Sequence, residues 1–249
     1  AHALGTLARM YPGRIPWIAL GSGEAINERT VGAGWPDKDE RDARLAEAAV
    51  IVRRLLAGDT VDHEGLLRVE KAKLWSLPDD PPRLIGAALS VGGARRVAAW
   101  ADGLLTSCAD LDELRRIVEA FRANGGAGKP IHLKVELSWA DTERAALEQA
   151  HRQWRYLLPG RRASQELKTP DEFDAASRDA SMVEIRKLVN VSSRPEDHIA
   201  WLRKRLDIGL ASIDIHDVGE NQSAFIETFG REVLPELRQT IAVAAGDEP

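Results

Sequence analysis

Five short apolar runs, each separated from the next by a helix-like segment, constrain the fold of this chain more than any other feature. Each run reads as a buried strand because it is rich in aliphatic residues and is bounded by glycine, proline or polar residues. The runs span 14–20, 83–88, 102–106, 131–138 and 211–216. A helix-like crossover between successive strands predicts an α/β protein with a parallel sheet and helices outside it.

The strand count leaves two architectures open. The chain has 249 residues, of which 44% are hydrophobic, and this is enough for a single domain over 1–249. A closed (βα)8 barrel needs eight strands, and only five runs are visible. The chain also opens inside a helix-like stretch. We therefore expect either an open five-stranded sheet or a barrel that lacks its first three βα units. A small hairpin at 60–75 and an irregular insertion at 158–190 interrupt the pattern.

Composition excludes several classes of protein. Cys108 is the single cysteine, so an internal disulfide is impossible and a reducing compartment is expected. No apolar run is long enough to span a bilayer, and no secretory leader is visible, so the expected location is cytoplasmic. The net charge is −5 with no basic stripe, which argues against nucleic acid or a membrane as partner. The histidines show no ligand spacing, so we predict no metal and a small-molecule substrate.

The loop after the first strand carries the sharpest candidate for chemistry. Functional side chains in parallel α/β folds gather where strands end, and here Gly21, Ser22 and Gly23 precede Glu24. The glycines would let a flat ligand approach the backbone, and a carboxylate there can orient a ligand or move a proton. The alternative is that Glu24 and Asn27 only cap the loop.

Two further strand ends suggest a phosphate site. Ala88, Leu89 and Ser90 lead into a helix, whose free N–H groups and dipole favour an anion. Ser90 could equally be an ordinary helix N-cap. Thr106 and Ser107 end the next strand, and their hydroxyls could donate to the same phosphate or cap the following helix.

His216 ends the last strand and is ambiguous from sequence. Its ring could contact a cofactor or a substrate, or Asp217 could hold it in place by a hydrogen bond. Trp154 and Gln153 lie on a predicted helix, where they could line a pocket or pack against another helix. We predict Glu24 and His216 as the catalytic candidates.

Several segments resemble a known family in order along nearly the whole chain. MYPGR (10–14), ALGSGEAINE (19–28), WPDKDERDARLAEA (35–48) and AWADGLLT (99–106) are similar to the bacterial luciferase-like superfamily, in the branch with the deazaflavin (F420)-dependent glucose-6-phosphate dehydrogenases. LSWADTE (137–143), TPDEFDAA (169–176) and IHDVGENQSAFIETFG (215–230) resemble a related FMN-dependent, "non-F420" group.

The resemblance implies a luciferase-like TIM barrel that binds a flavin or deazaflavin at the strand ends. The five runs would be strands four to eight, and the missing units would carry an acid–histidine pair and a tryptophan. Glu24 matches the family's active-site glutamate and Asn27 the nearby asparagine. The cofactor contacts that the resemblance and the strand ends together suggest are Gly21, Ser22, Gly23, Asn27, Ala88, Leu89, Ser90, Thr106 and Ser107.

The residues around the predicted pocket also bear on the choice of substrate. The sugar-phosphate enzymes place basic residues around the pocket, where this chain has Asp110 and Ser223–Ala224. A phosphate dianion would favour Lys or Arg there, so these residues argue against glucose 6-phosphate. The phosphate loop at 88–90 also lacks the two glycines and proline that the deazaflavin enzymes often have.

Three functions follow from these observations. The leading prediction is an FMN-dependent flavoprotein, an oxidoreductase or monooxygenase acting on a small organic molecule that is not a sugar phosphate. The alternative is an F420-dependent dehydrogenase of an alcohol. The third is a non-catalytic barrel fragment or binding scaffold, whose open edge beside 14–20 would favour association. A homodimer, or association through that edge, is expected.

Overall fold

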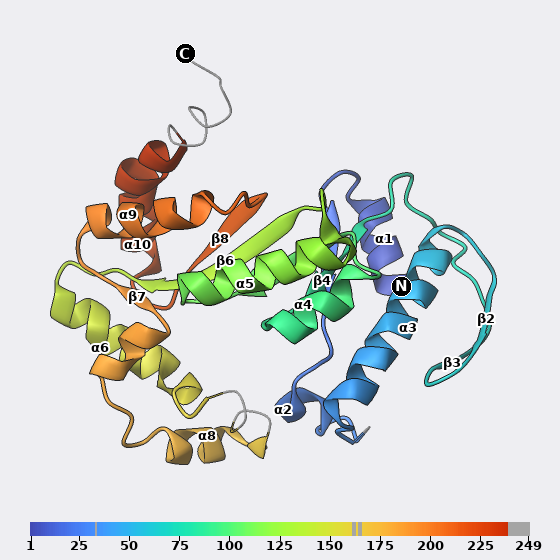
Figure 1. Ribbon diagram of the computed structural model, residues 1–249, viewed down its shortest axis with the longest axis horizontal. Coiled ribbons are helices and arrows are strands. Elements are labelled where there is room, and N and C mark those ends of the chain that lie inside the picture. The colour runs from blue at the N-terminus through green and yellow to red at the C-terminus, as the bar shows by residue number, and fades with distance from the viewer. Residues whose placement is uncertain (33, 161–162, 164–165, 239–249) are drawn as a thin grey trace. The chain divides into compact units, whose positions relative to one another are not determined.

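The computed structural model describes residues 1–32, 34–160, 163 and 166–238. The part of the predicted 158–190 insertion at 161, 162, 164 and 165 lies outside the described residues. Contacts divide the chain into two compact units (Figure 1), the first made of 1–106 and 116–131 and the second of 107–115 and 132–249. The two units are described separately below.

The first unit is built on three parallel strands. β1 (Trp17–Leu20) pairs with β4 (Arg83–Ala87), and β4 pairs with β5 (Gly103–Ser107). The helical segments are α1 (His2–Met10), α2 (Ala25–Glu28), α3 (Lys38–Leu56), α4 (Val91–Ala98) and η1 (Arg122–Gly126). Helix α5 (Leu111–Phe121) begins in the second unit and ends in the first. These strands confirm three of the five predicted runs, although β1 begins three residues after the start of its run.

Local sequence determines where the longest helix begins. The Asp37 side chain accepts a hydrogen bond from the Glu40 N–H at 2.9 Å and so caps α3. Beyond α3, β2 (Val61–Glu64) and β3 (Arg68–Ala72) form the predicted antiparallel hairpin, which lies beside α3 (Figure 1). His63 of β2 contacts Glu47 of α3 at 2.9 Å and ties the two together.

The first unit buries its core between helices and strands. Its apolar cluster combines α1, α3, the hairpin and β4 through Leu4, Ile51, Leu55, Leu56, Val61, Leu74 and Leu84. Helix α4 packs so closely on β4 that a Cβ at Gly86 would lie 2.6 Å from the Val97 Cβ. Glycine at this strand position therefore sets how near α4 comes to the sheet.

The second unit is centred on β6 (Ile131–Ser138). β7 (Asn190–Val191) and β8 (Ser212–Asp217) both pair with it in parallel. The helical segments are α6 (Glu143–Trp154), η2 (Arg155–Leu157), α8 (Pro170–Ala176), η3 (Val183–Lys187), α9 (Pro195–Leu206), α10 (Gln222–Thr228) and η4 (Phe229–Val233). The two-residue strand β7 was not predicted, because it is too short to form a pattern.

The second unit has its own buried cluster, made of Ala140, Ala146, Ala150, Ile185, Val189, Val191 and Val218. The parallel pairing and the helical crossovers confirm the α/β class. The expectation that three further βα units belong to this fold stays a prediction, as does the single-domain organisation.

Candidate functional site

The parallel register in the first unit brings two predicted loops to one edge. Leu20 pairs with Gly86, and Ala87 pairs with Leu105. The strands therefore end side by side, and the loops that follow them, 21–24 and 88–90, leave the sheet at the same edge. This is the edge at which parallel α/β folds place ligands.

Small residues line part of the sheet surface beside these loops. Ala19, Gly21 and Ala87 share one face by strand alternation, and a Cβ at Gly21 would lie 3.6 Å from the Ala87 Cβ. Ile85, which pairs with Ala19, and Leu105, which pairs with Ala87, lie on the same face. The small residues Gly21 and Ala87, where β1 and β4 end, therefore leave room for a planar ring at that end of the face.

Glu24 is exposed at the start of α2. It occupies the N-cap position, but its side chain makes no capping hydrogen bond within the described chain. Its backbone carbonyl instead accepts from the N–H groups of Asn27 at 3.1 Å and Glu28 at 3.0 Å. The alternative reading, in which this carboxylate caps the loop, is therefore not supported by the geometry. Asn27 is also exposed.

Ser90 uses its side chain to begin α4. Its Oγ accepts from the Gly93 N–H at 3.2 Å, which makes it the ordinary N-cap considered above. Leu89 is exposed and Ala88 is buried. Thr106 is also buried, and its hydroxyl has no hydrogen-bond partner among the described residues. A phosphate at 88–90 stays a prediction.

A charged network occupies one face of β6 in the second unit. Ser107 Oγ donates to Glu136 Oε2 at 3.0 Å, and Lys134 Nζ lies 3.1 Å from Glu136 Oε1. Lys134 Nζ is also 5.6 Å from the centre of the Trp154 ring. The Glu136 carboxylate therefore holds a hydroxyl on one side and an ammonium on the other.

His216 lies opposite Glu136 in the register of β6 and β8. Its ring meets Trp154 edge-on, with centroids 4.9 Å apart. Burial lowers the pKa of His216, the positive charge of Lys134 lowers it further, and Glu136 opposes them. The ring is therefore neutral at pH 7, with one nitrogen able to accept a proton.

Asp217 does not hold His216, contrary to one of the two readings of the sequence. Successive strand residues point to opposite faces, so the two side chains diverge. Gln222 donates to the Asp217 side chain at 3.4 Å, and His216 Nδ1 has no partner in the described part of the chain.

Sequence reasoning missed Lys134 and Glu136. Both were interpreted only as members of the apolar run 131–138, IHLKVELS. The signal that could have found them is the alternation with Leu133, Val135 and Leu137, since strict period-two alternation puts the two charges on one face.

The carboxyl group of Asp217 gives a testable pH dependence. Burial raises its pKa to about 6, because the cost of burying the charge exceeds the help from the Gly219 and Trp139 N–H groups. The folded state therefore binds this proton more tightly than the unfolded state, whose pKa is about 3.9. The stability that the protonated form gives is lost as the pH rises from about 4 to 6.

We expect Asp217→Asn to raise the free energy of unfolding by about 1–3 kcal/mol at pH 7.5, because it removes the buried charge. The gain should shrink at pH 4.5, where wild-type Asp217 is largely protonated. Urea unfolding at both pH values measures it. Asp214→Asn, at an exposed position of the same strand, is the control, and an equal effect of both variants would contradict the assignment.

The described residues contain no helix with both the length and the apolar character needed to cross a membrane. They also contain no cluster of three or more His, Cys, Asp or Glu side chains that could hold a metal ion.

Comparison with known proteins places the chain in a family. The family described as luciferase-like monooxygenase matches residues 1–211. This chain belongs to that family. It is therefore an oxidoreductase of the luciferase-like type, which confirms the resemblance seen in the sequence.

Two characterised relatives carry the same name. The F420-dependent glucose-6-phosphate dehydrogenase of Nakamurella multipartita is 29% identical over 97% of this chain and 73% of its own length. The F420-dependent glucose-6-phosphate dehydrogenase 1 of Rhodococcus jostii is 32% identical over 96% and 74%. Among solved structures, an F420-dependent secondary alcohol dehydrogenase in complex with an F420-acetone adduct has a TM-score of 0.82 at 24% identity, covering 94% of this chain and 72% of its own.

These relatives overturn the leading functional prediction. Their names give F420 as the cofactor, so the prediction of an FMN-dependent enzyme was wrong. Their names also give glucose 6-phosphate as the substrate, so the exclusion of that sugar phosphate was wrong. The exclusion depended in part on Asp110. In the structure, its carboxylate accepts from the Glu113 N–H at 2.7 Å, so it caps a helix and says little about the charge around a ligand.

Proposed function

We propose that this protein is an F420-dependent dehydrogenase that oxidises the alcohol group of a sugar phosphate. The names of its relatives supply the cofactor and the substrate class. The structural observation that supports the proposal is the exposed carboxylate of Glu24, beside the small residues Gly21 and Ala87 where β1 and β4 end.

Oxidation of an alcohol to a carbonyl removes a hydride from carbon and a proton from oxygen. A bound deazaflavin would supply the hydride acceptor. Gly21 and Ala87 would hold it, with the Asn27 amide nearby. Glu24 would accept the proton, since its carboxylate is exposed and has no other partner among the described residues.

The second unit carries a separate set of polar groups that could bind a substrate. His216 is neutral at pH 7 and can accept a proton or a hydrogen bond from a substrate hydroxyl. Ser107 and Glu136 can hydrogen-bond hydroxyl groups of a sugar. Ala88, Leu89, Ser90 and Thr106 remain the proposed contacts of the cofactor's phosphate.

Cofactor titration followed by turnover tests the proposal. F420 should bind and, on addition of glucose 6-phosphate, lose the absorbance of its oxidised form; FMN at the same concentration is the matched control. If F420 binds but glucose 6-phosphate does not reduce it, a panel of other phosphorylated sugars and simple alcohols identifies the substrate. Failure of F420 to bind, or to be reduced with every member of the panel, would contradict the proposal.

A further inference from the structure

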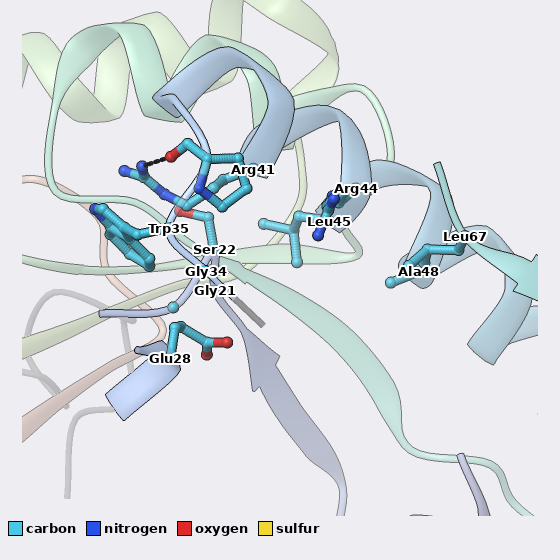
Figure 2. A pocket seen from close by; sticks show the side chains of 12 residues that line it. Gly21, Ser22, Glu28, Gly34, Trp35, Arg41, Arg44, Leu45, Ala48 and Leu67 are labelled. Carbon is cyan, nitrogen blue, oxygen red and sulfur yellow. Dashed lines mark hydrogen bonds between the residues drawn. The ribbon is translucent and has the colours of Figure 1, made fainter. Parts of the chain in front are cut away.

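A pocket of about 230 Å³ lies in the first unit between the 21–23 loop and α3 (Figure 2). Its lining includes Ser22, Trp35 and two arginines of α3, Arg41 and Arg44. We propose that this pocket binds an oxyanion, namely a phosphate group, through Arg41 and Arg44. Neither Arg41 nor Arg44 has a role in the proposed reaction, and the pocket is separate from the 88–90 loop.

Arg41 is the main reason for the proposal. Only 7% of it is exposed, and its guanidinium carbon lies 3.8 Å from the centre of the Trp35 ring. Nη1 donates to the Pro36 carbonyl at 2.6 Å, as the dashed line in Figure 2 shows. Nε has no partner within the described chain. A guanidinium has five N–H donors, and this one has a single acceptor.

The other charges nearby are largely matched. Arg44 pairs with Glu40 at 2.6 Å. Asp42 is shared between Lys38, which also lies 3.4 Å from Ser22 Oγ, and Arg96 at 2.6 Å.

Arg41, by contrast, has no carboxylate within ion-pair distance among the described residues. A buried cation without a counter-ion is costly, and a bound anion would remove that cost. Arg41 therefore brings to the pocket a positive charge that no carboxylate of the described residues neutralises by direct contact.

Glu28 is the carboxylate that lines the same pocket. It forms no ion pair in the described part of the chain, and Figure 2 shows it on α2, apart from Arg41. A ligand that spans the pocket would thus meet N–H donors at the arginines and an acceptor at Glu28. A phosphate ester that also carries hydroxyl groups satisfies both, since hydroxyls donate to carboxylates.

Three sources could supply the phosphate: a sugar phosphate, the phosphate of the cofactor, or free phosphate. The inference goes beyond the proposed function, because anion binding can be measured without turnover. Isothermal titration calorimetry of the full chain measures the affinity for each source. The three titrants are inorganic phosphate, glucose 6-phosphate and F420, each at constant ionic strength.

Arg44→Gln is the deciding variant, because its side chain is partly exposed and the fold does not depend on its burial. We expect it to weaken phosphate binding about 10-fold or more, since it removes a charge-assisted hydrogen-bond donor. Arg41→Gln should abolish binding if it folds. Arg54→Gln, on the same helix and paired with Asp59 at 3.1 Å, is the matched control and should bind like wild type.

Loss of affinity for glucose 6-phosphate in Arg44→Gln would identify the substrate as the source, and loss for F420 would identify the cofactor. Loss for inorganic phosphate alone would indicate a site for the free ion. The proposal is overturned if wild type binds none of the three, or if Arg44→Gln binds all three as wild type does. Reduction of F420 measured in parallel separates these outcomes from failure of the proposed function.

Discussion

The Glu24→Gln variant is expected to fold normally and to lose about 10²–10⁴-fold in kcat. The amide has the size of the carboxylate but cannot take a proton. Because Glu24 is exposed and its side chain caps nothing in the described structure, its replacement should leave the fold intact. The turnover of F420 with substrate gives kcat, and unfolding curves confirm that stability is unchanged.

A matched control for this variant is Glu64→Gln, which neutralises another exposed carboxylate of the first unit, on the hairpin. Its kcat should equal that of wild type. If Glu24→Gln kept full activity, Glu24 would not be the proton acceptor, and the His216 imidazole would be the next candidate. A variant that lost stability along with activity would instead indicate that the loop depends on Glu24 for its structure.

Removal of Arg205 is expected to have the largest effect on stability. Arg205 is only 2% exposed, and its guanidinium carbon stacks 3.4 Å from the centre of the Trp201 ring. Nη2 donates to the Ala109 carbonyl at 2.6 Å and Nη1 to the Trp201 carbonyl at 3.0 Å. Burial lowers its pKa to about 10, so the side chain stays charged at neutral pH.

We expect Arg205→Ala to lower the free energy of unfolding by about 3–5 kcal/mol, because it leaves the Ala109 carbonyl unpaired, removes the stacking and opens a cavity. Ala109 belongs to the loop directly after Ser107, so the hydroxyl that meets Glu136 should also lose its support. Urea unfolding measures the loss of stability, and KM for the substrate reports on the loop.

Lys204→Ala is the control for this loss, because Lys204 is the exposed neighbour on the same helix. It should change the free energy of unfolding by no more than about 0.5 kcal/mol. Equal effects of the two variants would show that the charge of α9, and not the burial of Arg205, determines stability.

The sequence predicted the architecture of this protein well, because strands and caps have local signatures. All five apolar runs form strands, and Asp37, a residue type that favours helix N-caps, caps α3. The placement of 21–24 and 88–90 at one edge followed from parallel pairing alone. The sequence also pointed to the correct family, while its departures at 88–90 and Asp110 led to the wrong cofactor and substrate.

The side-chain environments were less predictable. The helix PEDHIAWLRKRL reads as a charged surface segment, yet Arg205 is buried while Lys204 beside it is exposed. Arg41 similarly lies in a run of charged residues, DKDERDAR (37–44), and is buried against Trp35. Sequence alone could not separate these residues from their neighbours, since long cationic side chains bury their stems wherever a ring or a carbonyl is within reach.

By itself, the sequence determined which segments form strands and helices, where the helices begin and which family the chain belongs to. These depend on periodicity, caps and motifs that span a few neighbouring residues. Only the tertiary structure decided that Glu136 joins Ser107 to Lys134, that Asp217 turns away from His216, and that Arg41 has no counter-ion among the described residues. Such contacts join residues far apart in the chain, or depend on burial. Local sequence patterns predict neither long-range contacts nor the burial of a single side chain.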